Sequence, residues 1–251
     1  MHYRLFLLDL DDTLLDFRAS ERLSFERTLS GLGIGTRVDG LFADYQVANQ
    51  QLWRDLEDGR IDKDVLKVER FRRVFGQHGI DLDPAAASHA YLEWLAQTVV
   101  LVDGARSLCE ALSAHGQIGI ITNGIEQLQR RRIACSGLQD LIGFVATSEA
   151  CGHAKPDVRF FDYTTRLATA FDKRQTIIIG DRLEADVLGA NRFGIDSCWF
   201  NPHRLANGSS AVPTYEVAGL DLVPAVLGRS GTTPARGATD QGVLSRPSCA
   251  R

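Results

Sequence analysis

The sequence predicts an α/β fold, in which an open, doubly wound parallel sheet carries an α-helical domain inserted after its first strand. The evidence for the sheet is a set of short segments that are apolar almost without interruption, at residues 5–10, 117–121, 176–179 and 195–200. Strands that are buried on both faces show this continuous pattern, whereas strands with one solvated face alternate. The evidence for the insertion is the stretch from residue 17 to residue 100, which contains no comparable segment.

The other elements of the core fall between these strands. Residues 143–146 predict a fifth strand, and residues 214–217 a candidate edge strand. Residues 105–115 predict a helix that ends at Gly116 as a left-handed cap, and residues 158–168 predict another helix. This alternation of strands and helices places the functional site at the carboxyl ends of the strands.

The inserted stretch has helical spacing. After a turn at Asp58-Gly59, apolar residues recur every three or four positions, at Ile61, Val65, Val68, Phe71 and Phe75. An insert that follows the first strand must lie above the carboxyl end of that strand, so we expect it to cover the site as a cap. The predicted division is a catalytic core at residues 1–16 and 101–227, a helical cap at 17–100, and a tail at 228–251 whose composition predicts disorder.

Charge and composition exclude several classes of function. The net charge of −4 shows no excess of basic residues, so we expect no nucleic-acid polymer as a partner. No segment approaches the roughly 20 apolar residues that a membrane helix needs, so we expect no membrane partner. The five cysteines are scattered and form no CxxC pair, which argues against a zinc site and favours reduced thiols in a cytoplasmic protein. For the oligomeric state, the sequence is compatible with a monomer and with a homodimer.

Three acids, Asp9, Asp11 and Asp12, follow the first predicted strand within four residues. Carboxylates this close repel one another and need either a cation or exposure to water. The alternative to a functional site is a solvated turn in which Thr13 or Asp12 caps the next helix.

Two further polar segments stand at the ends of elements. Thr122-Asn123 follows the second core strand, where the free backbone N–H groups of a helix N-terminus suit a phosphate, although Thr-Asn-Gly is also a common turn. Lys155 precedes Pro156, a residue that fits the first turn of a helix. Taken alone, this lysine would be a surface residue.

A second buried strand also ends in acids. Asp181 directly follows the strand at residues 176–179 and its Gly180, and Asp186 comes five residues later. If the two acid-bearing strands are parallel neighbours, their carboxylates meet at one edge of the sheet. Hard oxygen ligands in such a group bind Mg²⁺.

These four segments in this order resemble the motifs of the haloacid dehalogenase superfamily, namely Asp9-x-Asp11-x-Thr13, Thr122-Asn123, Lys155, and Gly180-Asp181 with Asp186. The resemblance extends over about residues 3–225 and implies a Rossmann-like core with a helical cap. More narrowly, residues 8–14, 48–53, 118–124 and 198–201 are similar to the branch of pyrimidine 5′-nucleotidases that act on noncanonical nucleotides.

The resemblance implies a role for each motif residue. Asp9 would be the nucleophile that forms an aspartyl phosphate, and Asp11 would protonate the leaving alkoxide and later activate water. A second group would hold the equatorial phosphate oxygens, namely Thr122, Asn123 and Lys155. The expected cofactor, Mg²⁺, would be bound by the Asp9 carboxylate, the Asp11 backbone carbonyl, Asp181 and Asp186, the last as a ligand or as its support.

The implied substrate is a small phosphomonoester, a pyrimidine nucleoside 5′-monophosphate, with sugar phosphates and phosphoglycolate as alternatives. Phe17, Asn49 and Trp53 would contact the base, although the position of Trp53 is equally typical of a cap core. A 2-haloacid dehalogenase would leave Asp11 and Asp181 unexplained, and a non-catalytic binding protein should have lost at least one motif residue. Asp12, Glu149 and His153 have no assigned role.

Overall fold

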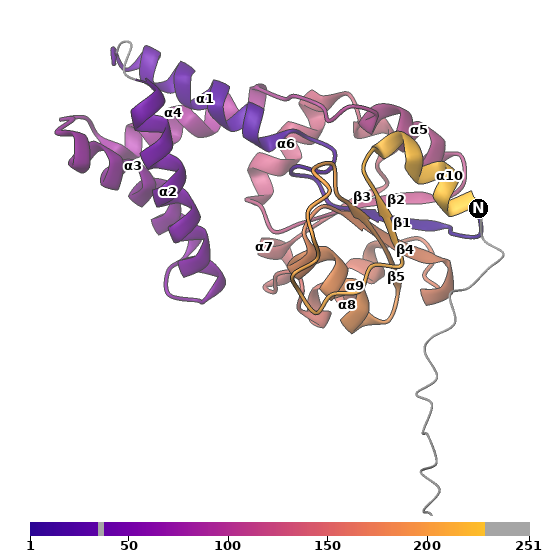
Figure 1. The fold of residues 1–251 in the computed structure, drawn as a ribbon. Helices are drawn as coiled ribbons and strands as arrows, with labels where there is room; N and C mark the ends of the chain where they lie inside the picture. The colour runs from indigo at the N-terminus through magenta and orange to yellow at the C-terminus, as the bar shows by residue number, and fades with distance from the viewer. Residues whose placement is uncertain (35–37, 229–251) are drawn as a thin grey trace, which may run out of the picture.

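The computed structural model describes residues 1–34 and 38–228. Its centre is a six-stranded parallel sheet in the order β3-β2-β1-β4-β5-β6. The strands are β1 (Leu5–Leu8), β2 (Gln117–Thr122), β3 (Phe144–Thr147), β4 (Thr176–Gly180), β5 (Asp196–Phe200) and β6 (Tyr215–Val217). The chain begins in the middle of the sheet, builds outward to one edge, and returns to build the other (Figure 1). The predicted α/β fold is confirmed, including its edge strand.

Strand β1 brings the first acidic segment to the centre of one sheet edge. Its last residue, Leu8, lies opposite Ile120 of β2 and Ile179 of β4. Asp9 therefore leaves the sheet between the ends of these two strands. The switch point of a doubly wound sheet is where such folds bind their ligands.

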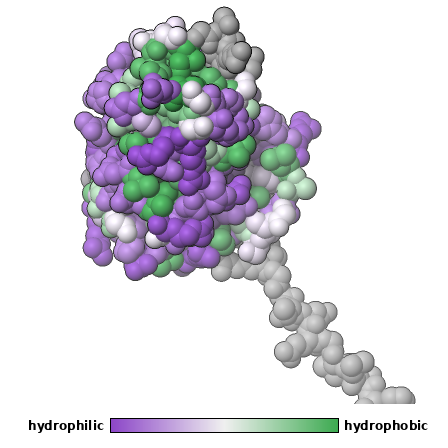
Figure 2. Space-filling view, turned by 90° about the vertical axis from the view of Figure 1, so that its left-hand side faces the viewer, coloured by the Kyte–Doolittle hydropathy of each residue, from purple (hydrophilic) through white to green (hydrophobic). Residues whose placement is uncertain are grey.

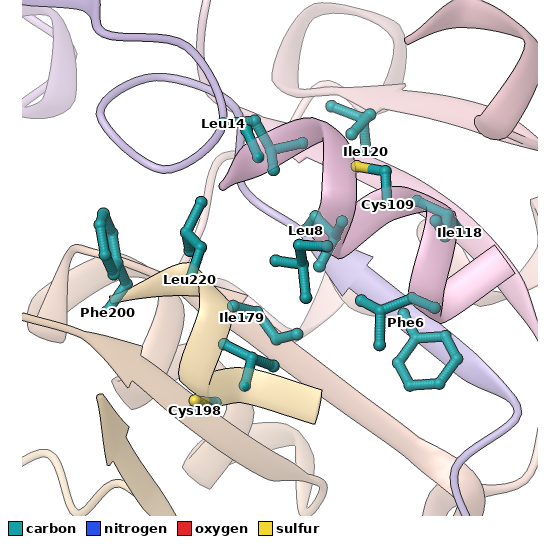
Figure 3. Packing of buried hydrophobic residues seen from close by; sticks show 14 of the residues in the cluster. Phe6, Leu8, Leu14, Cys109, Ile118, Ile120, Ile179, Cys198, Phe200 and Leu220 are labelled. Atoms are coloured by element: carbon teal, nitrogen blue, oxygen red, sulfur yellow. The ribbon is translucent and has the colours of Figure 1, made fainter. Parts of the chain in front are cut away.

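Helices cover both faces of the sheet, namely α5 (Ala105–Ser113), α6 (Glu126–Ser136), α8 (Val158–Leu167), α9 (Leu188–Phe193) and α10 (Val223–Gly228). Alternate residues of β1 face opposite layers, as the period of a strand requires. Phe6 and Leu8 pack beneath α5 and α10, and Figure 3 shows them among residues of β2 and β4. Leu5 and Leu7 pack with α8 and α9 on the other face. This two-sided burial explains the continuous apolar runs.

The stretch after β1 folds into four helices, α1 (Phe17–Gly31), α2 (Val38–Glu57), α3 (Lys63–His78) and α4 (Pro84–Gln97). They lie to one side of the sheet, with α4 against α6 (Figure 1). A hydrophobic cluster of their own holds them together, with Phe25, Tyr45, Phe71 and Tyr91 each drawn from a different helix. The division into a core and a cap as separate domains stays a prediction.

Short helical turns complete the chain, at Gln139–Leu141, Ser148–Cys151 (α7), Lys173–Gln175, Leu183–Val187 and Leu220–Leu222. The predicted tail, apart from Gly228 in α10, lies outside the described residues. Within residues 1–34 and 38–228, no helix is long and apolar enough to cross a membrane. The face formed by helices α1 to α4 is mainly hydrophilic, with its hydrophobic residues in separate patches (Figure 2).

Two local predictions were wrong, and one residue of the predicted helical spacing, Val65, lies on the exposed side of its helix. Gly116 is not a left-handed cap, because α5 ends at Ser113 and Gly116 has no positive φ; a Cβ there would lie 2.1 Å from the carbonyl oxygen of Arg4. Pro156 lies before Asp157, the N-cap of α8, and not in its first turn. Val65 is 44% exposed, because the buried face of α3 is formed by Leu66, Arg70, Phe71, Val74 and Phe75.

Candidate active site

Lys155 is the centre of a buried ionic group at the carboxyl ends of β1 and β4. Its Nζ donates to Oδ1 of Asp9 at 2.6 Å and to Oδ1 of Asp186 at 2.7 Å. The third donor goes to the backbone carbonyl of Ile121 at 2.9 Å. All three N–H bonds of the ammonium are used, so Lys155 is not the surface lysine that its position alone would suggest.

Three carboxylates surround this one lysine. Oxygens of Asp9, Asp181 and Asp186 lie within 4.8 Å of one another. Burial raises the pKa of Asp9, although Lys155 opposes that shift, and burial together with the charges of Asp9 and Asp186 raises the pKa of Asp181. A single ammonium leaves the group with excess negative charge. A divalent cation would relieve it, and oxygen ligands of this kind fit Mg²⁺.

Neighbouring residues hold the two acids of the fourth motif, Asp181 and Asp186, in place. The indole Nε1 of Trp199 donates to the backbone carbonyl of Asp181 at 2.9 Å. The backbone N–H of Arg182 donates to Oδ2 of Asp186 at 3.1 Å. A Cβ on Gly180 would lie 2.3 Å from that same Oδ2, so only glycine permits the approach.

Asp11 is held by two residues that the sequence analysis missed. Nε2 of Gln129 donates to Asp11 Oδ2 at 2.5 Å, and Nη1 of Arg132 forms an ion pair with Asp11 Oδ1. Gln129 also reaches Oγ1 of Thr122 at 3.1 Å, which links the predicted acid to a predicted phosphate ligand. Arg132 is fully buried, with its guanidinium 5.3 Å from the ring centre of Phe17. Both new residues lie on one face of α6.

Thr122 and Asn123 lie at the end of β2, as predicted. Oγ1 of Thr122 accepts from the backbone N–H of Gly124 at 3.0 Å. The side-chain amide of Asn123 makes two bonds to the backbone of Lys155, donating to its carbonyl at 3.0 Å and accepting from its N–H at 2.9 Å. This side chain therefore positions the lysine loop. Direct binding of phosphate by these residues stays a prediction.

Three residues that have no assigned part in the chemistry make local contacts, namely Asp12, Thr13 and Glu149. Asp12, which has a φ of 60°, accepts from the backbone N–H of Phe17 at 3.0 Å at the start of α1. Thr13 donates to Oδ2 of Asp9 at 3.1 Å and so contacts the predicted nucleophile. Glu149 accepts from the backbone N–H of Glu126 at 2.7 Å and pairs with Lys63 of α3 at 3.3 Å, which joins α3 to the sheet side of the molecule.

These groups open onto a cavity of about 220 Å³ between the sheet and helices α1 to α4. Its floor includes Asp9, Asp11 and Lys155. Its opposite wall is largely apolar and includes Phe17 and Trp53. Asn49, the third residue expected at the base, is not among the lining residues and is buried behind them. The volume lies below the usual range of ligand pockets, about 300–1,000 Å³, and so suits only a single small metabolite.

Comparisons with known proteins show the family of the chain. The family model for haloacid dehalogenase-like hydrolases matches residues 3–194. The chain is 38% identical to the pyrimidine 5′-nucleotidase PynA of Streptococcus pneumoniae, covering 86% of this chain and 92% of the relative. It is 32% identical to the pyrimidine 5′-nucleotidase YjjG of Escherichia coli, covering 74% and 82% respectively.

A solved structure is also similar. YfnB of Bacillus subtilis, classed as a HAD-hydrolase and crystallised bound to magnesium, superposes with a TM-score of 0.82 at 34% identity. The match covers 90% of this chain and 98% of that protein. A 2-haloacid dehalogenase from Pseudomonas syringae matches at 23% identity with a TM-score of 0.65, a likeness of fold alone.

Proposed function

Because the chain belongs to the haloacid dehalogenase-like hydrolase family and is a phosphomonoester hydrolase, we propose that it dephosphorylates pyrimidine nucleoside 5′-monophosphates through a phosphorylated Asp9. The observation that carries the mechanism is the Lys155–Asp9 contact of 2.6 Å in a cavity that also presents Asp11. A carboxylate held by an ammonium, beside a second carboxylate, suits covalent transfer of a phosphoryl group.

In the first step, an oxygen of Asp9 attacks phosphorus. The bond from phosphorus to the ester oxygen breaks, and the electron pair leaves with that oxygen. Asp11 gives its proton to this leaving alkoxide and becomes a carboxylate. Gln129 and Arg132, which donate to Asp11, would hold the resulting carboxylate in place.

In the second step, the Asp11 carboxylate removes a proton from water. The water oxygen attacks phosphorus, and the bond from phosphorus to Asp9 breaks, which releases phosphate and restores both acids. Lys155 stays on Asp9 throughout and offsets the negative charge that gathers around phosphorus. Thr122 and Asn123 would contribute hydrogen-bond donors to the remaining phosphate oxygens.

The residues present fit a magnesium ion, which the excess charge of the acid group supports. Asp9, Asp181, Asp186 and the backbone carbonyl of Asp11 would hold it. When bound, Mg²⁺ would let the anionic carboxylate and the anionic phosphate approach each other.

The relatives and the cavity support a nucleotide as substrate. PynA and YjjG are named as pyrimidine 5′-nucleotidases. Phe17 and Trp53 give the cavity flat aromatic surface, which suits a planar base better than a sugar phosphate or phosphoglycolate. A dehalogenase would need neither the proton transfer of Asp11 nor a metal at Asp181, whereas the proposed phosphatase uses both residues.

A panel of phosphomonoesters assayed with Mg²⁺ tests the proposal. We expect kcat/KM for UMP, dUMP and dTMP to exceed that for ribose 5-phosphate and phosphoglycolate by at least tenfold. Equal values would remove the nucleotidase assignment while leaving the phosphatase in place. Release of halide from 2-chloropropionate in place of phosphate release would overturn the chemistry itself.

A further inference from the structure

We propose that Arg70, on helix α3, recognises the substrate at the end opposite to the phosphate by donating a hydrogen bond to a carbonyl oxygen of the base. This inference rests on the proposed nucleotidase function and names its specificity residue. Arg70 is only 3% exposed, yet it lines the same cavity as Asp9 and Lys155. Buried arginines are rare, and one that faces a ligand cavity calls for an explanation.

The guanidinium of Arg70 has donors to spare. Its Nε donates to the backbone carbonyl of Lys67 at 3.2 Å, and Nη1 reaches Oδ1 of Asn49 at 3.5 Å, a long contact. Nη2 is buried and has no hydrogen-bond partner within the described part of the chain. A buried N–H without a partner costs about 1–3 kcal/mol, and more when the group is charged. In our proposal the missing partner is an acceptor on a ligand in the cavity that Arg70 lines.

The same guanidinium is held rigidly. It lies 4.7 Å from the ring centre of Tyr91 and 5.7 Å from those of Tyr45 and Phe71. Behind it, Asn49 donates to Oε1 of the buried Glu21 at 3.1 Å. The aromatic rings and Asn49 fix the orientation of the Arg70 guanidinium before a ligand binds. A donor held in this way lowers the entropic cost of binding.

The chemistry of the cavity limits what Arg70 can bind. Arginine carries only donors, so its partner must be an acceptor. The phosphate belongs at Lys155 on the sheet side of the cavity, whereas Arg70, Phe17 and Trp53 line it from helices α3, α1 and α2. A ligand with an anion at one end, a planar apolar-faced ring, and an exposed carbonyl at the other matches all three features. A keto pyrimidine nucleotide has this form.

The test compares substrates with and without a base. We expect Arg70→Lys and Arg70→Gln to lower the ratio of kcat/KM for UMP to kcat/KM for ribose 5-phosphate by about 10- to 100-fold, the loss that one charge-assisted hydrogen bond predicts. A matched control is Arg72→Gln on the same helix, whose side chain is 64% exposed and pairs with Glu69. Its substrate ratio should stay within twofold of the wild-type value.

A purely structural role for Arg70 predicts a different result, in which both substrates lose activity equally and the ratio is unchanged. That result would overturn the inference. Because Arg70→Gln leaves Glu21 without its counter-charge, the double variant Glu21→Gln/Arg70→Gln supplies a second, neutral background, and its ratio must fall as well. If the wild-type enzyme itself shows no preference for UMP over ribose 5-phosphate, the proposed function fails. If it shows that preference and the Arg70 variants retain it, only the role of Arg70 fails.

Discussion

The guanidinium of Arg132, fully buried on α6, forms an ion pair with the carboxylate of Asp11. The same Nη1 lies 2.9 Å from Oε1 of Gln129, which itself donates to Asp11. Two residues of helix α6 therefore hold the carboxylate of Asp11, the predicted proton-transfer group. Arg132 contacts Asp11 but is not itself one of the residues that line the cavity, so we infer that it positions the acid.

Replacing Arg132 by methionine should therefore impair the proton transfers and spare substrate binding. We expect kcat to fall by about 10²–10⁴-fold, the usual contribution of general acid–base catalysis, while KM changes by less than threefold. Removal of one partner of a buried ion pair lowers stability, so circular dichroism must first show that the variant is folded. Steady-state kinetics with UMP and Mg²⁺ measure the split, and Arg132→Lys should recover part of the lost kcat.

The matched control is Arg130→Met on the same helix. Arg130 is half exposed and pairs with Glu126 one turn away. Its kcat should stay within twofold of wild type. A fall in KM and kcat of equal size for Arg132→Met, or an equal effect of Arg130→Met, would contradict the positioning role.

Asp9→Asn should abolish turnover. The amide is a poor nucleophile, and of the two described carboxylates that pair with Lys155, Asp9 and Asp186, only Asp9 lines the cavity. We expect kcat to fall by at least about 10⁴-fold, as for the nucleophiles of other enzymes with a covalent intermediate. The protein should retain its circular dichroism spectrum, and rapid quenching with labelled substrate should trap phosphoenzyme from wild type only. Phosphoenzyme in the variant would rule out Asp9 as the attacking group.

Much of this site could be predicted from the sequence, because strand order determines which segments meet. Acids that follow two buried parallel strands must share a sheet edge, so Asp9 and Asp181 were found from pattern alone. Arg132 and Arg70 could not be found in this way. Each stands beside more exposed arginines, at 130 and 131 or at 72 and 73, and the sequence does not distinguish a buried arginine from its neighbours. Each buried arginine has a polar partner that is distant in sequence. The partner of Arg132 is Asp11, and that of Arg70 is Asn49, which is bonded to Glu21.

Gly180 should not tolerate a side chain. The added methyl group of Gly180→Ala would lie 2.3 Å from Oδ2 of Asp186, which Lys155 and a backbone N–H hold in place. We expect a loss of about 1–3 kcal/mol of unfolding free energy, as for other overpacked sites, together with a raised Mg²⁺ concentration for half-maximal activity. Urea denaturation and a Mg²⁺ titration of activity measure the two effects.

Gly76→Ala is the control for Gly180→Ala. Gly76 lies inside α3, and a Cβ there meets nothing within 4 Å. Alanine should stabilise the protein by about 0.5–1 kcal/mol through its helix propensity, with no change in the Mg²⁺ titration. If both variants behaved alike, the crowding at Asp186 would not be the cause.

Glu21 should make stability depend on pH. Burial raises its pKa to about 7, and the charge of Arg70 opposes that shift. Because the pKa of Glu21 is higher in the folded state, its contribution to stability is fully present below pH 4.5, the ordinary value, and is lost as pH rises through about 7.

Glutamine cannot titrate, so between pH 5 and pH 8 the unfolding free energy of Glu21→Gln should rise by about 1–3 kcal/mol relative to wild type. Urea denaturation in EDTA at several pH values measures this difference, and the control is Glu26→Gln, at a half-exposed position of the same helix, whose curve should run parallel to wild type. Parallel curves for Glu21→Gln would show that this carboxyl titrates alike in the folded and unfolded chain.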